Sequence, residues 1–372
     1  MDLLGLSHDA LAAEFARLNG KSRHRGKEGE FHGGAVFRQL YRQGIFSPES
    51  LAAFTANPAL AEKARRHFRF QLPPVVQKAG DGTTYKFLLR LDDGLVSESV
   101  VIPMRHYKSL CISSQVGCKM GCTFCETAQL GFLRHLTAAE IVAQVMVARH
   151  QLREPIENIV FMGMGEPLDN LDHVLTAIRI LSDQRGLDIA QSHITISTVG
   201  HIPSLRRMIT LARLPKETGI PHIRLAVSLN APDDAARSRI MPMNRQWPLA
   251  ELCQVLREYP LPRKGDFILF EYVLIPGVND APADAQAVAD LLRGIRGCVN
   301  LIPYNPRRES PFAKPEDASV KAFFAALMAA GQYCRIRGTK GQGVMAACGQ
   351  LGSREMRRRG SPSTAAENQA VM

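Results

Sequence analysis

The chain has 372 residues, of which 45% are apolar, enough for a substantial buried core and too many for general disorder. Lysine and arginine outnumber aspartate and glutamate by 46 to 35, which gives a formal net charge of +11. A positive balance of this size favours a polyanionic partner, since phosphate contacts release counterions, although a merely basic protein would show the same charge. The length predicts one large domain with a smaller accessory domain.

The amino-terminal end reads as a helical region rather than as a secretory leader, because residues 1–15 lack a basic start and an unbroken apolar run. No stretch is apolar for long enough to cross a bilayer, so we expect a cytoplasmic protein. The helical pattern continues to about Pro73 and predicts an accessory domain over residues 1–73. In residues 74–107, apolar runs flank Asp92-Asp93-Gly94, which predicts a β-hairpin.

Six short apolar runs separated by helical patterns predict a catalytic barrel over residues 108–351. The runs are 109–117, 158–165, 193–200, 223–230, 267–277 and 298–305. Thr137 and Glu140 form a capping-box signature at the start of one intervening helix. Nearly continuous apolar strands alternating with helices predict an α/β fold with buried parallel strands, a partial (βα)6 barrel. Residues 352–372, with several arginines, are expected to form a flexible basic tail.

Four of the eight cysteines fall within fifteen residues, and three of them form the pattern C-x3-C-x2-C. These are Cys118, Cys122 and Cys125. Three thiolates on one short loop can hold a four-iron cubane and leave one iron open to the amino and carboxylate groups of S-adenosylmethionine. Structural zinc normally takes four protein ligands, and ferredoxin clusters recruit a fourth cysteine. Because no second C-x2-C pair exists, both of these readings fit less well.

The cysteine motif, with Phe124 before its last cysteine, resembles the signature of the radical S-adenosylmethionine superfamily. More narrowly, the segments FMGMGEPLDN, AVSLNAP, EYVLIPGVND, NLIPYNP and AACGQL resemble, in the same order, those of the ribosomal RNA adenine methyltransferases. That family contains housekeeping enzymes that act on adenine C2 and resistance enzymes that act on adenine C8. The resemblance spans about residues 37–351 and implies an incomplete (βα)6 barrel behind a helical RNA-binding domain.

The resemblance also implies a reaction that uses two thiols. Cys348 would accept a methyl group from one S-adenosylmethionine, and a second molecule would supply the 5′-deoxyadenosyl radical that activates this group. Addition to adenine would join protein and RNA covalently until Cys111 forms a disulfide with Cys348. Glu98 matches the family's proton acceptor, although without the resemblance a surface glutamate would be the preferred interpretation.

Further residues match the family's contacts to S-adenosylmethionine. They are Gly165, Glu166, Ser197, Ser228, Leu229, Asn230 and Asn305. The implied cofactors are a [4Fe-4S] cluster and two molecules of S-adenosylmethionine per turnover. The implied partners are RNA (23S ribosomal RNA, with transfer RNA as a further candidate) and an electron donor such as flavodoxin or ferredoxin, and we expect a monomer.

The GEP segment favours C2 over C8 as the methylated carbon, and C8 methylation with antibiotic resistance stays open as the alternative. Two interpretations that assign the protein to other functional classes also stay open. One is a radical enzyme of the same superfamily that acts on a non-RNA substrate. The other is a non-catalytic iron–sulfur protein that binds RNA, which would have no use for Cys348 or a second thiol.

Overall fold

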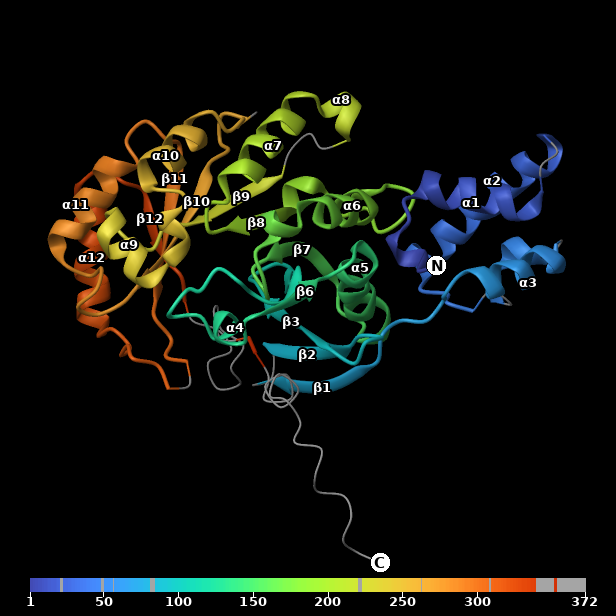
Figure 1. Cartoon of the computed structure of the whole chain (residues 1–372), viewed down its shortest axis with the longest axis horizontal. Coiled ribbons are helices and arrows are strands. Elements are labelled where there is room, and N and C mark those ends of the chain that lie inside the picture. Colours follow the sequence, from blue (N-terminus) through green and yellow to red (C-terminus); the bar gives the residue numbers. More distant parts are fainter. Residues whose placement is uncertain are drawn as a thin grey trace, which may run out of the picture.

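The amino-terminal part of the protein is helical. The computed structural model describes residues 1–20, 23–47, 50–55, 57–80, 84–219, 223–261, 263–307, 309–338 and 351–352. Its first helices lie together at one end of the molecule (Figure 1): α1 (His8–Asn19), α2 (Arg23–Arg38) and α3 (Pro58–His67). A Cβ atom on Gly29 would lie 2.5 Å from the Phe15 carbonyl oxygen, and one on Gly33 would lie 2.7 Å from Ala12 Cα. Helices α1 and α2 therefore pack backbone against backbone, which only glycine permits at these two positions.

A ten-stranded sheet forms the centre of the molecule, in the order β1-β2-β3-β4-β7-β8-β9-β10-β11-β12. Strands β1 to β4 pair antiparallel, and every pairing from β4 to β12 is parallel. The strands are β1 (Val75–Gly80), β2 (Tyr85–Arg90), β3 (Val96–Pro103), β4 (Lys108–Cys111), β7 (Ile156–Phe161), β8 (Ile194–Thr198), β9 (Arg224–Ser228), β10 (Ile268–Leu274), β11 (Gly297–Pro303) and β12 (Cys334–Ile336). A separate two-stranded sheet pairs β5 (Gln115–Gly117) with β6 (Phe132–His135).

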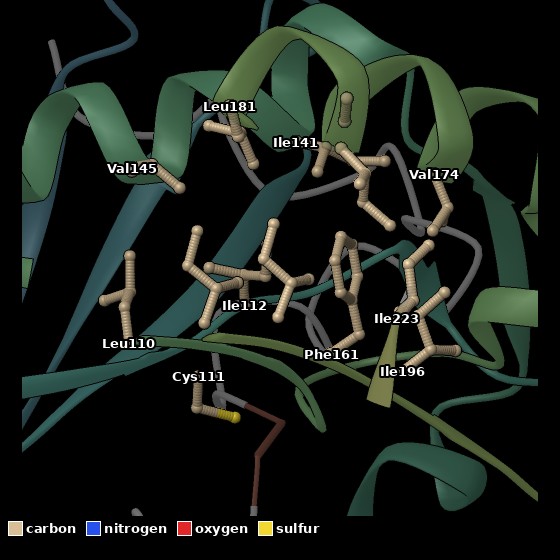
Figure 2. Packing of buried hydrophobic residues seen from close by; sticks show 14 of the residues in the cluster. Leu110, Cys111, Ile112, Ile141, Val145, Phe161, Val174, Leu181, Ile196 and Ile223 are labelled. Carbon is tan, nitrogen blue, oxygen red and sulfur yellow. The ribbon is translucent and has the colours of Figure 1, made fainter. Parts of the chain in front are cut away.

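Helices follow most of the parallel strands and cover the outer face of the sheet. They are α5 (Ala138–Met146), α6 (Leu171–Ser182), α7 (Ile202–Arg213), α8 (Pro215–Thr218), α9 (Asp234–Ile240), α10 (Leu249–Arg257), α11 (Pro282–Leu291) and α12 (Asp317–Ala329). The short helix α4 (Glu126–Gln129) instead lies between β5 and β6. In Figure 2, Val145 of α5 and Leu181 of α6 face Leu110 and Ile112, whereas Cys111 points to the opposite side of its strand. The apolar core thus lies between helices and sheet, and the other face of the sheet is left for the interior of the barrel.

The predicted fold class is confirmed, with two differences in the strands. The run 109–117 is divided between β4 and β5, which belong to different sheets, so its prediction as one strand was wrong. A seventh parallel strand, β12, was not predicted, because three residues with a single buried side chain carry no apolar pattern. The predicted hairpin is present as β2 and β3. The sheet continues from β3 to β4, across the boundary expected at residues 107 and 108, and the domain limits stay a prediction.

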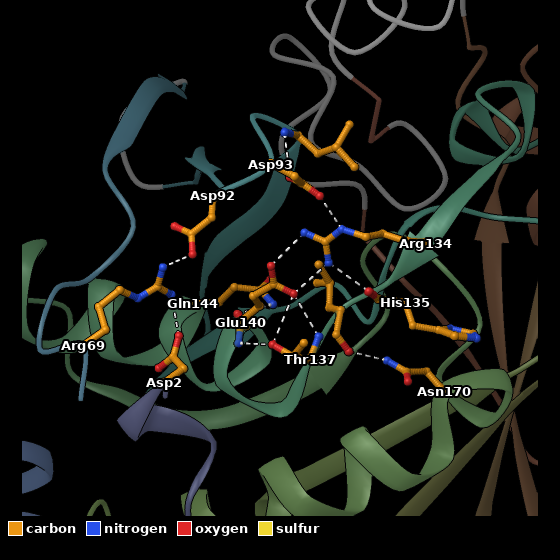
Figure 3. Close-up of polar contacts among 12 residues, drawn as sticks. Asp2, Arg69, Asp92, Asp93, Arg134, His135, Thr137, Glu140, Gln144 and Asn170 are labelled. Carbon is orange, nitrogen blue, oxygen red and sulfur yellow. Dashed lines mark hydrogen bonds and ion pairs between the residues drawn. The ribbon is translucent and has the colours of Figure 1, made fainter. Parts of the chain in front are cut away.

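The turn of this hairpin is tied to the barrel by Arg134 of β6 (Figure 3). The Arg134 guanidinium donates to both carboxylate oxygens of Glu140 at 2.8 Å and to Asp93 at 2.5 Å. Glu140 also completes the predicted capping box with Thr137 at the start of α5. A single charged side chain therefore connects the hairpin, the small sheet and α5. In the described part of the chain no helix is both long and apolar enough to cross a membrane.

One buried amide fixes α5 to the strands around the barrel interior. Gln144 is fully buried, and its Oε1 accepts hydrogen bonds from the Ser99 hydroxyl and from the Ser113 backbone N–H, both at 2.8 Å. Its Nε2 donates to the Ser113 carbonyl at 2.9 Å. Ser113 belongs to the irregular segment between β4 and β5, which has no strand partner for these backbone groups. Gln144 thus supplies the pairing that a strand would otherwise give.

We predict that Gln144→Ala lowers the free energy of unfolding by about 3 kcal/mol, since it leaves two buried backbone groups of Ser113 without partners. Equilibrium urea denaturation measures this loss. Gln151→Ala is the matched control, because Gln151 is exposed just beyond the end of the same helix. A Gln144→Ala protein within about 0.5 kcal/mol of the unmodified chain, the range expected of a surface change, would contradict the assignment.

Candidate functional site

A cavity opens at the carboxyl ends of the parallel strands. Its wall includes the three clustered cysteines and most of the residues predicted to bind S-adenosylmethionine: Cys118, Cys122, Cys125, Gly165, Glu166, Ser197, Ser228, Asn230 and Asn305. These residues come from the ends of four strands and from the loop between β5 and β6. The carboxyl end of a parallel barrel is where such folds place their functional groups. Residues far apart in the sequence are therefore brought to one site.

The three thiols lie in an apolar shell that is suited to a cluster. Met120, Met241 and Tyr304 pack around them. Burial raises the pKa of the Cys118 thiol to about 12, and it also raises the pKa values of Cys122 and Cys125. Protons on all three thiols would thus be the resting state of the metal-free chain, and metal ligation would displace them.

Hydrogen-bond donors from the backbone already point at two of these sulfurs. The Met120 N–H donates to Cys118, and the N–H groups of Thr127 and Ala128 donate to Cys125. Such donors favour the thiolate, the form that ligates iron. Within the described ranges, no three His, Cys, Asp or Glu side chains are arranged to hold a single metal ion. The three thiols line one cavity wall, as the ligands of a single cluster would.

Gly165 and Glu166 form a tight loop directly after β7. Gly165 has φ +98°, and a Cβ atom there would lie 2.5 Å from Gln115 Cβ, so both backbone conformation and space require glycine. The Glu166 N–H donates to Gln115 Oε1 at 2.9 Å. Its carboxylate accepts from the backbone N–H groups of Leu168 and Val199 at 3.1 and 2.9 Å. Burial nevertheless raises the pKa of Glu166 to about 7. A buried carboxylate poised in this way is suited to a cationic ligand group.

The remaining predicted contacts divide into two kinds. Ser197, Ser228 and Asn305 line the cavity at the strand ends. Asn230 lines it too, but its side chain accepts from the Val273 N–H at 2.8 Å and its φ of +58° shapes the turn after β9. Leu229 lies in the apolar core and is not among the residues that line the cavity.

Sequence reasoning missed a buried arginine beneath the cavity. Arg237 is 1% exposed, and its guanidinium donates to the carbonyl oxygens of Val199, Ser228 and Leu229 at 2.6 to 2.9 Å. It joins the ends of β8 and β9, and its charge attracts the Cys122 thiolate. No sequence signal identifies it, because most arginines on amphipathic helices are exposed.

Glu271 is a second residue of the site that the sequence analysis missed, although the sequence contains a signal for it. It is a charged residue within the apolar strand β10, and it lines the cavity. Its Oε1 accepts from Asn300 at 2.8 Å, and its Oε2 lies 3.6 Å from the Arg337 guanidinium, which also lines the cavity. An ion pair between a buried carboxylate and a half-buried guanidinium therefore forms part of the cavity wall.

Of the three predicted catalytic residues, two belong to the described part of the chain and one does not. Glu98 on β3 and Cys111 on β4 are both buried. Neither is among the residues that line the cavity. Cys348 lies outside the described residues, and so does its predicted disulfide with Cys111. Cys253, Cys298 and Cys334, to which no role was assigned, are buried free thiols.

We predict that Gly165→Ala destabilises the protein more than Gly131→Ala does. Both glycines have positive φ, +98° and +72°, so both substitutions carry the cost of a left-handed alanine, about 1–2 kcal/mol. Only Gly165→Ala also introduces a steric clash, because a Cβ on Gly131 would have no atom within 4 Å. The additional loss should be about 2 kcal/mol in urea denaturation. Equal losses for the two variants would show that the close approach to Gln115 carries no cost.

Comparison with known proteins assigns the family. Residues 112–289 match the Radical SAM superfamily. A protein from Protochlamydia amoebophila, named probable dual-specificity RNA methyltransferase RlmN 1, is 42% identical, with 88% of this chain and 89% of the relative covered. The dual-specificity RNA methyltransferase RlmN of Syntrophobacter fumaroxidans is 43% identical over 87% of this chain and 92% of its own length.

A solved structure agrees with these matches. The crystal structure of a radical SAM methyltransferase from Sphaerobacter thermophilus has a TM-score of 0.84 and 35% identity, and the match covers 94% of this chain and 99% of that one. Both the sequence relatives and the solved structure extend well beyond the barrel, into the helical amino-terminal part. The chain therefore belongs to the RlmN family of dual-specificity RNA methyltransferases, within the radical SAM superfamily.

Proposed function

We propose that this chain transfers a carbon unit, derived from the methyl group of S-adenosylmethionine, to an adenine ring carbon of RNA. The favoured carbon is C2, and the proposed substrates are 23S ribosomal RNA and transfer RNA. The observation that carries the proposal is the gathering of three ligand-type thiols and a buried carboxylate on one cavity. The dual-specificity names of the relatives support more than one RNA substrate and do not favour the C8 alternative or a non-RNA substrate.

Cys118, Cys122 and Cys125 would hold the [4Fe-4S] cluster. When bound, the cluster supplies the electron that cleaves S-adenosylmethionine, and an electron donor such as flavodoxin or ferredoxin would replenish it. The chain's own part is to keep water away and to favour thiolates. The apolar shell and the backbone donors to Cys118 and Cys125 support both roles.

Glu166 would bind the amino group of S-adenosylmethionine. It lies 41 residues along the chain from the last ligand cysteine, and its carboxylate lines the same cavity as the three thiols. Ser197, Ser228 and Asn305 would contact the ribose, adenine or carboxylate, since all three face the cavity from different strands. Asn230 and Leu229 would contribute mainly through backbone groups, because their side chains are engaged elsewhere.

Cys348 would carry the methyl group, and Cys111 would release the product. Leu351 lines the cavity, and its carbonyl accepts from the Thr127 hydroxyl at 2.7 Å, next to the ligand Cys125. Cys348 is three positions earlier, so the chain can place its Cα at most about 11 Å from that of Leu351. Cys111 lies on the sheet face that points away from the helices, as Figure 2 shows. These placements support a reaction between the two thiols at the cavity.

The other parts of the chain would serve RNA binding. Residues 1–73 would form an accessory domain that binds RNA, joined through residues 74–107 to the catalytic barrel over residues 108–351. The net charge of +11 supports contacts to the phosphate backbone. The basic segment 352–372 would add to these contacts. Action on ribosomal and transfer RNA would place the protein in the cytoplasm, and we expect a monomer.

Replacement of the methyl carrier should separate the two halves of the reaction. Cys348→Ala is expected to cleave S-adenosylmethionine to 5′-deoxyadenosine under anaerobic reduction and to leave RNA unmodified, because no thiol receives the methyl group. Liquid chromatography measures the first product, and mass spectrometry of nuclease-digested RNA measures the second. Cys253→Ala, a buried cysteine of α10, serves as the control and should methylate RNA. Methylated adenine from Cys348→Ala would rule out the two-thiol route.

The affinity for S-adenosylmethionine should depend on pH through Glu166. Its pKa is raised to about 7 by burial, and a cationic amino group binds the ionised form. Protonation therefore weakens binding as the pH falls below 7, and the dissociation constant should be about tenfold larger at pH 6 than at pH 8. Equilibrium dialysis with labelled S-adenosylmethionine measures it. Glu166→Gln should remove the dependence, whereas Glu258→Gln, an exposed carboxylate on the far end of α10, should keep it. An affinity that is constant between pH 6 and 8 would exclude this role.

A further inference from the structure

Lys86, Glu98 and Cys111 share the face of the sheet that forms the barrel interior. In the strand register, Val100 of β3 pairs with both Lys86 and Cys111, and Cys111 pairs with Val160 of β7. Residues two apart on a strand point to the same side, so Glu98 points the way Val100 does. The cavity-lining Met162, two residues after Val160, lies on this side as well.

A contact on the opposite face confirms this orientation. The hydroxyl of Ser99, the residue after Glu98, donates to Gln144 of the outer helix α5. Because neighbouring residues on a strand alternate between faces, Glu98 points away from α5 and toward the interior. Glu98 therefore reaches the reaction side of the sheet although it is fully buried.

A buried ion pair holds Glu98 by one of its two oxygens. The Lys86 ammonium lies 3.2 Å from Glu98 Oε2, and the side chains are 9% and 0% exposed. The other oxygen, Oε1, has no hydrogen-bond partner among the described residues. Replacing a buried ion pair by apolar residues of similar volume is often neutral or stabilising. A contribution to the stability of the fold therefore does not explain why these two positions are charged. An oxygen left free inside the protein is, in contrast, what a proton acceptor requires.

The backbone of Glu98 is also fixed relative to the loop that would bind S-adenosylmethionine. The Ser113 hydroxyl donates to the Glu98 carbonyl at 2.6 Å, and the Met164 N–H donates to the Ser113 hydroxyl at 2.9 Å. Met164 directly precedes Gly165. Strand β3 is thus connected to this loop by two hydrogen bonds through one side chain.

We propose that Lys86 is a positioning residue for proton removal from the adenine ring: its side chain holds Oε2 of the buried Glu98 and leaves Oε1 free to accept the proton. A carboxylate removed from water is costly unless an opposite charge lies beside it. In the step itself the ring C–H bond breaks, its electron pair stays with the ring, and an O–H bond forms on Glu98. This inference rests on the proposed function and adds a residue to it.

Single-turnover reactions of the anaerobically reconstituted full chain with RNA test this role. The variants are Lys86→Met, Lys86→Gln, Lys86→Arg and Glu98→Gln. Three products are measured: 5′-deoxyadenosine, the covalently joined protein–RNA species on denaturing gels, and methylated adenine by mass spectrometry. Lys86→Met and Lys86→Gln should form 5′-deoxyadenosine normally and lose about 100-fold in the rate of methylation, the size of a proton-transfer contribution. The joined species should persist, as in Glu98→Gln.

Two variants keep the test independent of folding. Lys86→Arg retains the charge and should recover most of the methylation. Lys86→Gln still fills the site and can donate a hydrogen bond, so it covers the case in which Lys86→Met does not fold. A purely structural role would lower 5′-deoxyadenosine and methylated adenine together and would leave no excess of the joined species.

The outcomes also separate this inference from the proposed function. If the unmodified chain cleaves S-adenosylmethionine but never methylates RNA, the proposed function fails, and this inference fails with it. If the unmodified chain methylates RNA and Lys86→Gln does so within about threefold of its rate, far from the loss expected for proton transfer, the role of Lys86 is overturned and the function stands.

Discussion

The organisation of the site depends on the cost of placing negative charge in a dry cavity. In the proposed function, three thiols would lose their protons to ligate iron, although burial raises the pKa of each. The fold offsets this cost with fixed dipoles and one buried cation: backbone N–H groups donate to Cys118 and Cys125, and Arg237 attracts Cys122. An apolar shell then keeps water from competing for these donors.

The same constraint explains why so many polar side chains lie inside an otherwise apolar sheet. Glu98 is paired with Lys86, Glu271 with Asn300 and Arg337, and Gln144 with backbone groups of Ser113. Each group is placed by a strand or by a helix that packs on the sheet, and rigid elements hold a side chain more closely than loops do. The helices can therefore stabilise the fold by packing their apolar faces on the outer side of the sheet. The polar side chains on the inner side of the sheet are then available for the reaction.

The sequence was sufficient to predict five of the parallel strands, the hairpin and the capping box at Thr137 and Glu140, because each depends on local periodicity or on a turn signal. It could not predict β12, whose three residues are held by pairing with β11 rather than by their own pattern. The cysteine motif was found from its spacing and Glu166 through a resemblance, and the cavity brings them together. Arg237 and Lys86 were not found, since their roles come from burial and from partners on other strands, which no single stretch of sequence encodes.

The most direct measurement is the iron and sulfide content of the anaerobically reconstituted chain, with electron paramagnetic resonance of the reduced protein before and after S-adenosylmethionine is added. Three ligand cysteines around a cubane predict about four irons and four sulfides per chain. They also predict a spectrum that changes when S-adenosylmethionine binds the open iron. Protein that holds zinc or no metal, or a cluster spectrum that is indifferent to S-adenosylmethionine, would contradict the account.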